Sequence, residues 1–392
     1  MDFTLDEELE AVRGLASKIF TDRATTDRVR AVEHSPTHLD EELWAELGKA
    51  GLLGIALPEE AGGAGLGLDA LCVLLEEQGR FVAPVPLWPA AVGALAIAEY
   101  GTAEQRTSLL PGAADGSSRL TVALEEFGPP DPTTPHCTAH RDGDGAFTRG
   151  GWRLTGTKAV VPSPTGAGHV LVSAITEAGP GLFLVASDAE GVAWERAETT
   201  THDLAGTLIL TGAPAQAVGT PGGGAVEWIV DRATVALAAV QLGVAQGALR
   251  HAVTYLSERE QFGRPLATFQ AVQHQLADCY IDIDAMRVCL WQAITTLEEA
   301  GTEATGTSDD DAAAGTSTRA AAAAVLVAKW WAGDAGLTVA HRVQHVHGGI
   351  GVDVDYPVHR YFLWARQIAG TLGGPSADLA RLGTVLATAV TS

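Results

Sequence analysis

The chain has few basic side chains and no long apolar run that is free of charge. Lysine and arginine total 25 against 48 aspartates and glutamates, which gives a formal net charge of −23 over 392 residues. Such a charge repels nucleic-acid phosphates and anionic membrane surfaces, so neither is an expected partner. The chain also lacks a stretch of about 18 apolar residues, and its acidic start, MDFTLDEELE, differs from a signal peptide. We expect a cytoplasmic protein.

Cysteine is scarce as well. Cys72, Cys137, Cys279 and Cys289 are far apart and form no CxxC pair, so they indicate neither structural zinc nor a disulfide framework. His341 and His345 have the i, i+4 spacing of metal ligands, but no HExxH glutamate accompanies them. With His347, we interpret them as helix-surface or nucleotide-adjacent residues and expect no metal.

Hydrophobic periodicity divides the chain into three parts. Apolar residues recur at helical spacing up to about residue 115, after a capping-box start at Thr4 and Glu7. Between 118 and 222, short β-rich runs alternate with turn residues, and from Val226 the helical period returns. We predict an all-α domain over 1–115, a closed β-domain over 116–223 and a helical bundle over 224–392. The polar stretch 301–318 is predicted to be an exposed loop.

Four segments carry a family resemblance. They are LPEEAGGAGLGLDALCVLLEEQG at 57–79, RLTGTKAVV at 153–161, SEREQFGRPLATFQ at 257–270 and VQHVHGGIGVDVDYPVHR at 343–360. In this order and spacing they resemble the acyl-CoA dehydrogenase family of flavoproteins. The resemblance implies an α+β fold with an N-terminal helical domain, a central β-barrel and a C-terminal four-helix bundle. It also implies FAD, held between barrel and bundle and partly by a neighbouring subunit.

The resemblance assigns cofactor residues to two segments. Arg259, Gln261 and Phe262 match the family's arginine-and-FG motif, where an arginine beside a polar donor suits a pyrophosphate. Glycines in the second segment let backbone N–H groups approach a phosphate, and we favour this interpretation over the alternative of a simple turn that ends a helix. The further matching positions are Gln270, Gln344, Gly348 and Gly349.

The barrel segment departs from the family's pattern. Where many members place an aromatic residue and a hydroxyl against the flavin, in a K-x-W-x-T pattern, this chain reads Lys158, Ala159, Val160, Val161 and Pro162. Any flavin contact from this segment would therefore come mainly from backbone.

The catalytic base also departs from the commonest pattern. Removal of the α-proton of a thioester needs a carboxylate, which contributes ~10²–10⁴-fold to the rate. Gly373 occupies the position of the family's usual YEG glutamate. Other members carry a glutamate directly before an arginine on the first bundle helix, where this chain reads Asp231 and Arg232. Asp231 is the candidate base, and Arg232, Gly373 and Gly374 are candidate substrate contacts. Alternatively, Asp231 only complements the helix dipole.

The resemblance implies an FAD-dependent dehydrogenation of an acyl-CoA thioester, with a bulky or steroid-type acyl chain. Electrons would pass to an electron-transfer flavoprotein. A homodimer, a homotetramer or a heterotetramer with a paralogous subunit is expected. Two alternatives stay open: a half-site structural subunit of a heteromeric dehydrogenase, and another flavin reaction such as carrier-protein thioester oxidation or monooxygenation.

Overall fold

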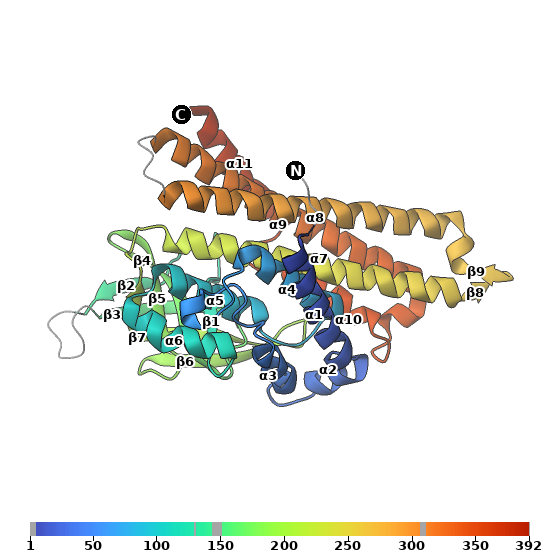
Figure 1. Cartoon of the computed structure of the whole chain (residues 1–392), viewed down its shortest axis with the longest axis horizontal. Coiled ribbons are helices and arrows are strands. Elements are labelled where there is room, and N and C mark those ends of the chain that lie inside the picture. The colour runs from blue at the N-terminus through green and yellow to red at the C-terminus, as the bar shows by residue number, and fades with distance from the viewer. Residues whose placement is uncertain (1–4, 129–130, 143–150, 306–310, 392) are drawn as a thin grey trace. The chain divides into compact units, whose positions relative to one another are not determined.

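The computed structural model describes residues 5–128, 131–142, 151–305 and 311–391 (Figure 1). The chain forms two compact units. Unit 1 comprises Met1–Thr26, Cys72–Ala83 and Thr234–Ser392, and unit 2 comprises Asp27–Leu71 and Pro84–Ala233. The boundary between them passes through a long helix, α7. The predicted division into three domains stays a prediction, but the order of helices, strands and helices is as expected.

Helices form the first part of the chain. Asp6, not Thr4, caps the first of them, because its carboxylate accepts a hydrogen bond of 2.8 Å from the backbone N–H of Leu9. Thr4 itself lies outside the described residues. The helices are α1 (Glu7–Arg23), α2 (Thr26–Glu33), α3 (Glu41–Lys49), α4 (Gly67–Phe81), α5 (Leu87–Tyr100) and α6 (Ala103–Asp115), with a 3₁₀ turn η1 at Glu59–Ala61.

Seven strands in unit 2 form one mixed sheet. They are β1 (Arg119–Ala123), β2 (Thr138–Arg141), β3 (Trp152–Pro162), β4 (Ala167–Thr176), β5 (Gly179–Ala186), β6 (Val192–Glu198) and β7 (Leu204–Val218). The pairings run from β4 through β2, β3, β7 and β5 back to β4, so the sheet closes on itself. Leu154, Val172, Phe183 and Leu208 are buried in its interior. The apolar faces of the strands therefore meet inside the closed sheet.

The last part of the chain is helical again. The long helices α8 and α9, yellow and orange in Figure 1, pack against each other, and α9 also packs on α10 and α11. Their bounds, with those of the neighbouring elements, are α7 (Ala225–Glu258), β8 (Glu260–Gln261), β9 (Arg264–Pro265), η2 (Leu266–Thr268), α8 (Gln270–Thr305), α9 (Asp311–His347), η3 (Gly348–Val352), α10 (Val358–Gly370) and α11 (Pro375–Thr391). Helix α7 is long and apolar enough to cross a membrane, but 83% of its most apolar window is buried, as in a core helix.

The loop predicted over 301–318 is largely wrong. Helix α8 continues to Thr305 and α9 begins at Asp311, while 306–310 lie outside the described residues. Alanine has the highest helix propensity, and the run Ala312–Ala314 followed by Ala320–Ala324 offsets the polar residues of this stretch. Composition alone therefore understated the helical preference of this connection.

Three helices of unit 1 cross at very short distance. A Cβ atom added at Gly243 of α7 would lie 1.8 Å from the carbonyl oxygen of Glu76 on α4. One added at Gly247 would lie 2.4 Å from both the carbonyl oxygen of Arg80 and the ring of Tyr361 on α10. The Tyr361 hydroxyl donates to that same carbonyl at 2.9 Å. Glycine is therefore required at these two positions of α7 for the helices to approach.

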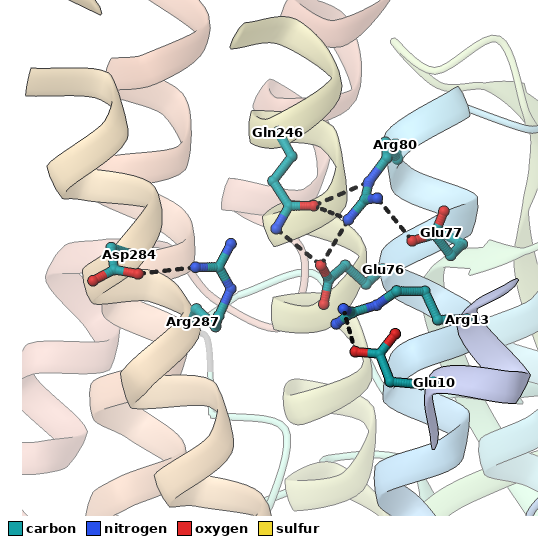
Figure 2. A network of polar contacts seen from close by, with 8 residues as sticks. All are labelled: Glu10, Arg13, Glu76, Glu77, Arg80, Gln246, Asp284 and Arg287. Atoms are coloured by element: carbon teal, nitrogen blue, oxygen red, sulfur yellow. Dashed lines mark hydrogen bonds and ion pairs between the residues drawn. The ribbon is translucent and has the colours of Figure 1, made fainter. Parts of the chain in front are cut away.

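A polar network accompanies this crossing (Figure 2). Arg80 donates to the Oε1 atom of Gln246 at 2.5 Å and to Glu76 at 3.0 Å, and the amide of Gln246 donates to Glu76 at 2.9 Å. Arg80 also forms an ion pair of 3.0 Å with Glu77, whose side chain is fully buried. Burial raises the pKa of Glu77. This network fixes α4 on α7 within unit 1.

Candidate functional site

The candidate base lies early in α7. Asp231 is the seventh residue of this helix and is half-buried, with Arg232 directly after it. The favourable effect of the helix dipole falls off within the first turn, and that turn is occupied by Glu227. The dipole alone therefore does not account for an acidic residue at position 231.

Arg232 is held in place by its own helix and by an aromatic ring. Its guanidinium lies 3.9 Å from the centroid of the Trp228 ring, and Nη1 donates to the carbonyl oxygen of Trp228 at 3.4 Å. Tyr100 of α5 packs edge-on against the same ring, with 5.6 Å between centroids. Burial lowers the pKa of Arg232, and the charges of Asp231 and Glu99 oppose this shift. Asp231 thus directly precedes an arginine whose guanidinium is held against an aromatic ring.

The segment that replaces the family's aromatic pattern has a structural role. Lys158 of β3 is fully buried, and its ammonium donates to Glu126 at 2.5 Å and to the Ser173 hydroxyl at 3.0 Å. Beyond it the pairing of β3 with β7 is interrupted, and Val160 is 40% exposed with φ of +47°. A β-branched residue is rare in this left-handed region. The bulge therefore directs a small apolar side chain outward where other members place an aromatic one.

The arginine-and-FG motif forms a short hairpin between α7 and α8. Gln261 of β8 pairs with Arg264 of β9, and the turn between them contains Phe262, which is 91% exposed. Arg259 and Gln270, the residue that begins α8, are exposed as well. These predicted cofactor residues therefore lie together on a protruding element of unit 1.

A pocket of about 620 Å³ is bordered by two of the predicted cofactor residues of the second segment. It lies where α9, η3 and α10 meet, and Gln344 and Gly348 line it. A Cβ atom at Gly348 or Gly349 would meet nothing within 4 Å, so the backbone here faces open space. The Oε1 atom of Gln344 is buried and has no hydrogen-bond partner among the described residues. Open glycine backbone and an unsatisfied amide oxygen fit a polar ligand such as the nucleotide part of FAD.

The glycine turn before α11 is supported by a buried charge. Leu372 and Gly373 have φ of +58° and +106°, respectively. From α9, the ammonium of Lys329 donates to the carbonyl oxygen of Gly373 at 3.3 Å and lies 3.9 Å from Asp378. Both charged side chains are buried, and burial raises the pKa of Asp378. Position 373 therefore offers a fixed backbone turn instead of a catalytic side chain, and Gly374 completes it.

These features define a class of protein: a flavoprotein dehydrogenase with helices around a closed sheet and a carboxylate–arginine pair on the first bundle helix. Two family models match the chain, "Acyl-CoA dehydrogenase, N-terminal domain" over residues 6–117 and "Acyl-CoA dehydrogenase, C-terminal domain" over residues 222–381. A curated relative, "Acyl-CoA dehydrogenase FadE27" of Mycobacterium tuberculosis, is 37% identical over 392 residues, 99% of each chain.

Two solved structures are also similar to this chain. One, described as a variant of the Tcur3481-Tcur3483 steroid ACAD, has a TM-score of 0.90 and 64% identity, covering 99% of this chain and 100% of the other. The other, the ChsE4-ChsE5 complex of Mycobacterium tuberculosis, has a TM-score of 0.87 and 36% identity, covering 99% of each. The chain therefore belongs to the acyl-CoA dehydrogenase family of FAD-dependent oxidoreductases, and FAD is its cofactor. The family, fold and cofactor predictions are confirmed.

Sequence reasoning passed over several residues that the structure places at these sites. Tyr100 and Trp228 were not selected, although both are aromatic residues beside charged ones. Lys329 stands in an apolar stretch, and a lysine there was a signal of a buried charge. His359 gave no local signal, because only the packing of α10 on α9 brings it to the pocket of Gln344.

Proposed function

We propose that this chain catalyses the α,β-dehydrogenation of a bulky, steroid-type acyl-CoA thioester, with Asp231 as the base. The observation that carries the proposal is the half-buried Asp231 directly before the immobilised Arg232 on α7. The substrate class draws on the similar structure described as a steroid acyl-CoA dehydrogenase.

The chemistry assigned to Asp231 is proton transfer. Its carboxylate takes the proton from the α-carbon of the thioester, and the two electrons of that C–H bond form the new double bond. FAD, when bound, supplies the acceptor for the hydride that leaves the β-carbon. Arg232 directly follows this carboxylate, and its contact with the Trp228 ring holds the guanidinium in place.

Cofactor binding is assigned to the two open elements of unit 1. Arg259, Gln261 and Phe262 at the hairpin and Gln270 at the start of α8 present exposed groups, and Gln344, Gly348 and Gly349 border open space. Because both elements leave polar groups open to a ligand or a partner, we assign them to a flavin shared between subunits. We further propose assembly into an oligomer, electron transfer to an electron-transfer flavoprotein and a cytoplasmic location.

A second candidate is a half-site subunit that completes the active site of a paralogous partner. Two observations favour it: the two similar structures are described by pairs of component names, and Val160 stands where other members have an aromatic residue against the flavin. In that case Asp231 would have no catalytic role, and the partner would supply the base.

The test is anaerobic reduction of the bound flavin by steroid-type acyl-CoA. Asp231→Asn should slow the bleaching of the flavin by ~10²–10⁴-fold, because a neutral amide cannot accept the proton. FAD content, measured by visible absorption, should stay the same. Glu227→Gln, an acidic position one turn earlier on α7, serves as the matched control and should react like the unmodified chain. Bleaching of Asp231→Asn at the wild-type rate would rule out Asp231 as the base, whereas an unmodified chain that binds little flavin when purified alone would favour the half-site subunit.

A further inference from the structure

Arg232 and Trp228 lie four residues apart on α7, so their side chains share one face of the helix. The guanidinium of Arg232 lies 3.9 Å from the centroid of the Trp228 ring, and Nη1 donates to the Trp228 carbonyl oxygen at 3.4 Å. The face of an aromatic ring attracts a cation, and the attraction is stronger where water is excluded. Burial lowers the pKa of Arg232. The ring therefore offsets part of the cost of burying this charge.

Trp228 is in turn held by Tyr100, the last residue of α5. The two rings meet edge to face, with 5.6 Å between their centroids and an angle of 85° between their planes. This is one of the favoured geometries of an aromatic pair. Trp228 lies in the first turn of α7, and the ends of helices tend to fray. The contact with Tyr100 thus restrains the ring at a position where the helix itself restrains it least.

The Tyr100 ring is fixed to the end of the sheet. A Cβ atom added at Gly219, the residue after β7, would lie 3.1 Å from Cδ1 of Tyr100, so the ring lies directly on this backbone. Nearby, Nε2 of Gln105 on α6 donates to the carbonyl oxygen of Ala217 at 3.2 Å. The corner between α5 and α6 is therefore tied to β7 at two points. A row of contacts leads from the end of β7 through the two aromatic rings to the guanidinium, and all of it belongs to unit 2.

Such a row matters where a charge has to keep one position. An arginine side chain has several rotatable bonds, and fixing it costs side-chain entropy. In the proposed reaction, negative charge moves from the carboxylate of Asp231 to the thioester as the α-proton is transferred. A cation one residue further along α7 stabilises the moved charge best if it is in place beforehand, because no rearrangement is then needed during the reaction.

We propose that Trp228 and Tyr100 are positioning residues for the dehydrogenation and act through Arg232. The Trp228 ring holds the guanidinium, and Tyr100 fastens that ring to the sheet. The inference rests on the proposed function, because that function assigns Arg232 to the acyl-CoA site. Removing either ring should loosen the guanidinium and should slow the reaction only for that reason.

The first measurement is the rate at which phenylglyoxal modifies Arg232 in the purified full-length chain, followed by peptide mass spectrometry. Trp228→Leu should raise this rate by about tenfold, since the cation–π contact is lost. Tyr100→Leu should raise it by about threefold, since an aromatic pair is lost. Trp228→Phe and Tyr100→Phe should restore most of the protection, because each keeps a ring. Trp331→Leu, which removes a half-buried tryptophan of α9 that packs on Trp330, is the matched control and should leave the rate unchanged.

The second measurement is anaerobic bleaching of the bound flavin by steroid-type acyl-CoA, with FAD content checked by visible absorption. Trp228→Leu should slow bleaching at saturating substrate by about tenfold. The half-saturating concentration should change by less than about twofold, because the cation acts on charge that develops only during the reaction. In an Arg232→Gln background, Trp228→Leu should slow bleaching by less than about twofold further, because the residue through which the ring acts is already gone. A merely structural role would give the same loss in both backgrounds.

Unchanged labelling of Arg232 in Trp228→Leu would overturn the inference, and so would rate losses that multiply in the double variant. If Trp228→Leu does not fold, Trp228→Phe replaces it, and labelling should then rise by about twofold. The two proposals fail separately. Bleaching of Asp231→Asn at the wild-type rate refutes the base, whereas the labelling of Arg232 depends on neither the base nor bound flavin. An unmodified chain whose flavin is not bleached by any acyl-CoA thioester would overturn the catalytic role of the two rings, even if labelling rises.

Discussion

The barrel side and the bundle side of the chain, both of which the family resemblance assigns to the flavin, differ in how their polar groups are used. On the barrel side, Lys158 is fully buried and paired with Glu126 and Ser173. On the bundle side, Arg259 and Gln261 are exposed, and Gly348 faces open space. The charged group of the barrel segment is paired inside the protein, whereas the polar groups on the bundle side are exposed. The barrel segment therefore has a structural role, and the exposed groups of the bundle are the ones that we propose bind the cofactor.

The comparison predicts the largest effect on stability at Lys158. Lys158→Met should lower the free energy of unfolding by about 3–5 kcal/mol, because it leaves the carboxylate of Glu126 partly buried without its cation. Urea unfolding followed by circular dichroism measures this change. Lys158→Met/Glu126→Gln should recover part of the loss, since no unpaired charge remains. A single variant as stable as the unmodified chain would contradict a structural role for the pair.

A second charged group of unit 2 makes stability depend on pH. Burial raises the pKa of Asp203 to about 6, although its carboxylate accepts a hydrogen bond of 3.0 Å from Thr201. The folded state then binds this proton more tightly than the unfolded state does, so stability is greatest at low pH and falls as pH rises toward about 6.

Asp203→Asn should remove that dependence. At pH 8 the variant should be more stable than the unmodified chain by up to about 3 kcal/mol, and near pH 4 the difference should shrink. Melting temperatures across this pH range measure both. If the difference in stability between Asp203→Asn and the unmodified chain is the same at pH 4 and at pH 8, the pKa of Asp203 is not raised in the folded state.

The order of elements and the family could be predicted from sequence, because periodicity and spaced motifs are local properties, while the cofactor residues stay a prediction. The helical connection around Asp311 could not, because alanine-rich helix propensity competed with the polar composition. The pairing of Lys158 with Glu126 also lay beyond sequence reasoning, since 32 positions separate them and only the fold brings the loop after β1 to β3. The same applies to His359, which reaches the pocket through the packing of α10 on α9.

The smallest expected effect concerns the exposed side of the comparison. Arg259→Ala should weaken FAD binding by about tenfold through loss of a charge-assisted hydrogen bond, while the free energy of unfolding changes by less than about 0.5 kcal/mol. Fluorescence titration with FAD and urea unfolding measure the two quantities. Arg264→Ala, on the same hairpin, removes the same charge, but Arg264 lies 4.1 Å over the ring of Phe269. If both variants weaken FAD binding equally, the hairpin attracts FAD through its general positive charge and not through specific recognition by Arg259. A loss of stability in Arg259→Ala would contradict the difference between exposed Arg259 and buried Lys158.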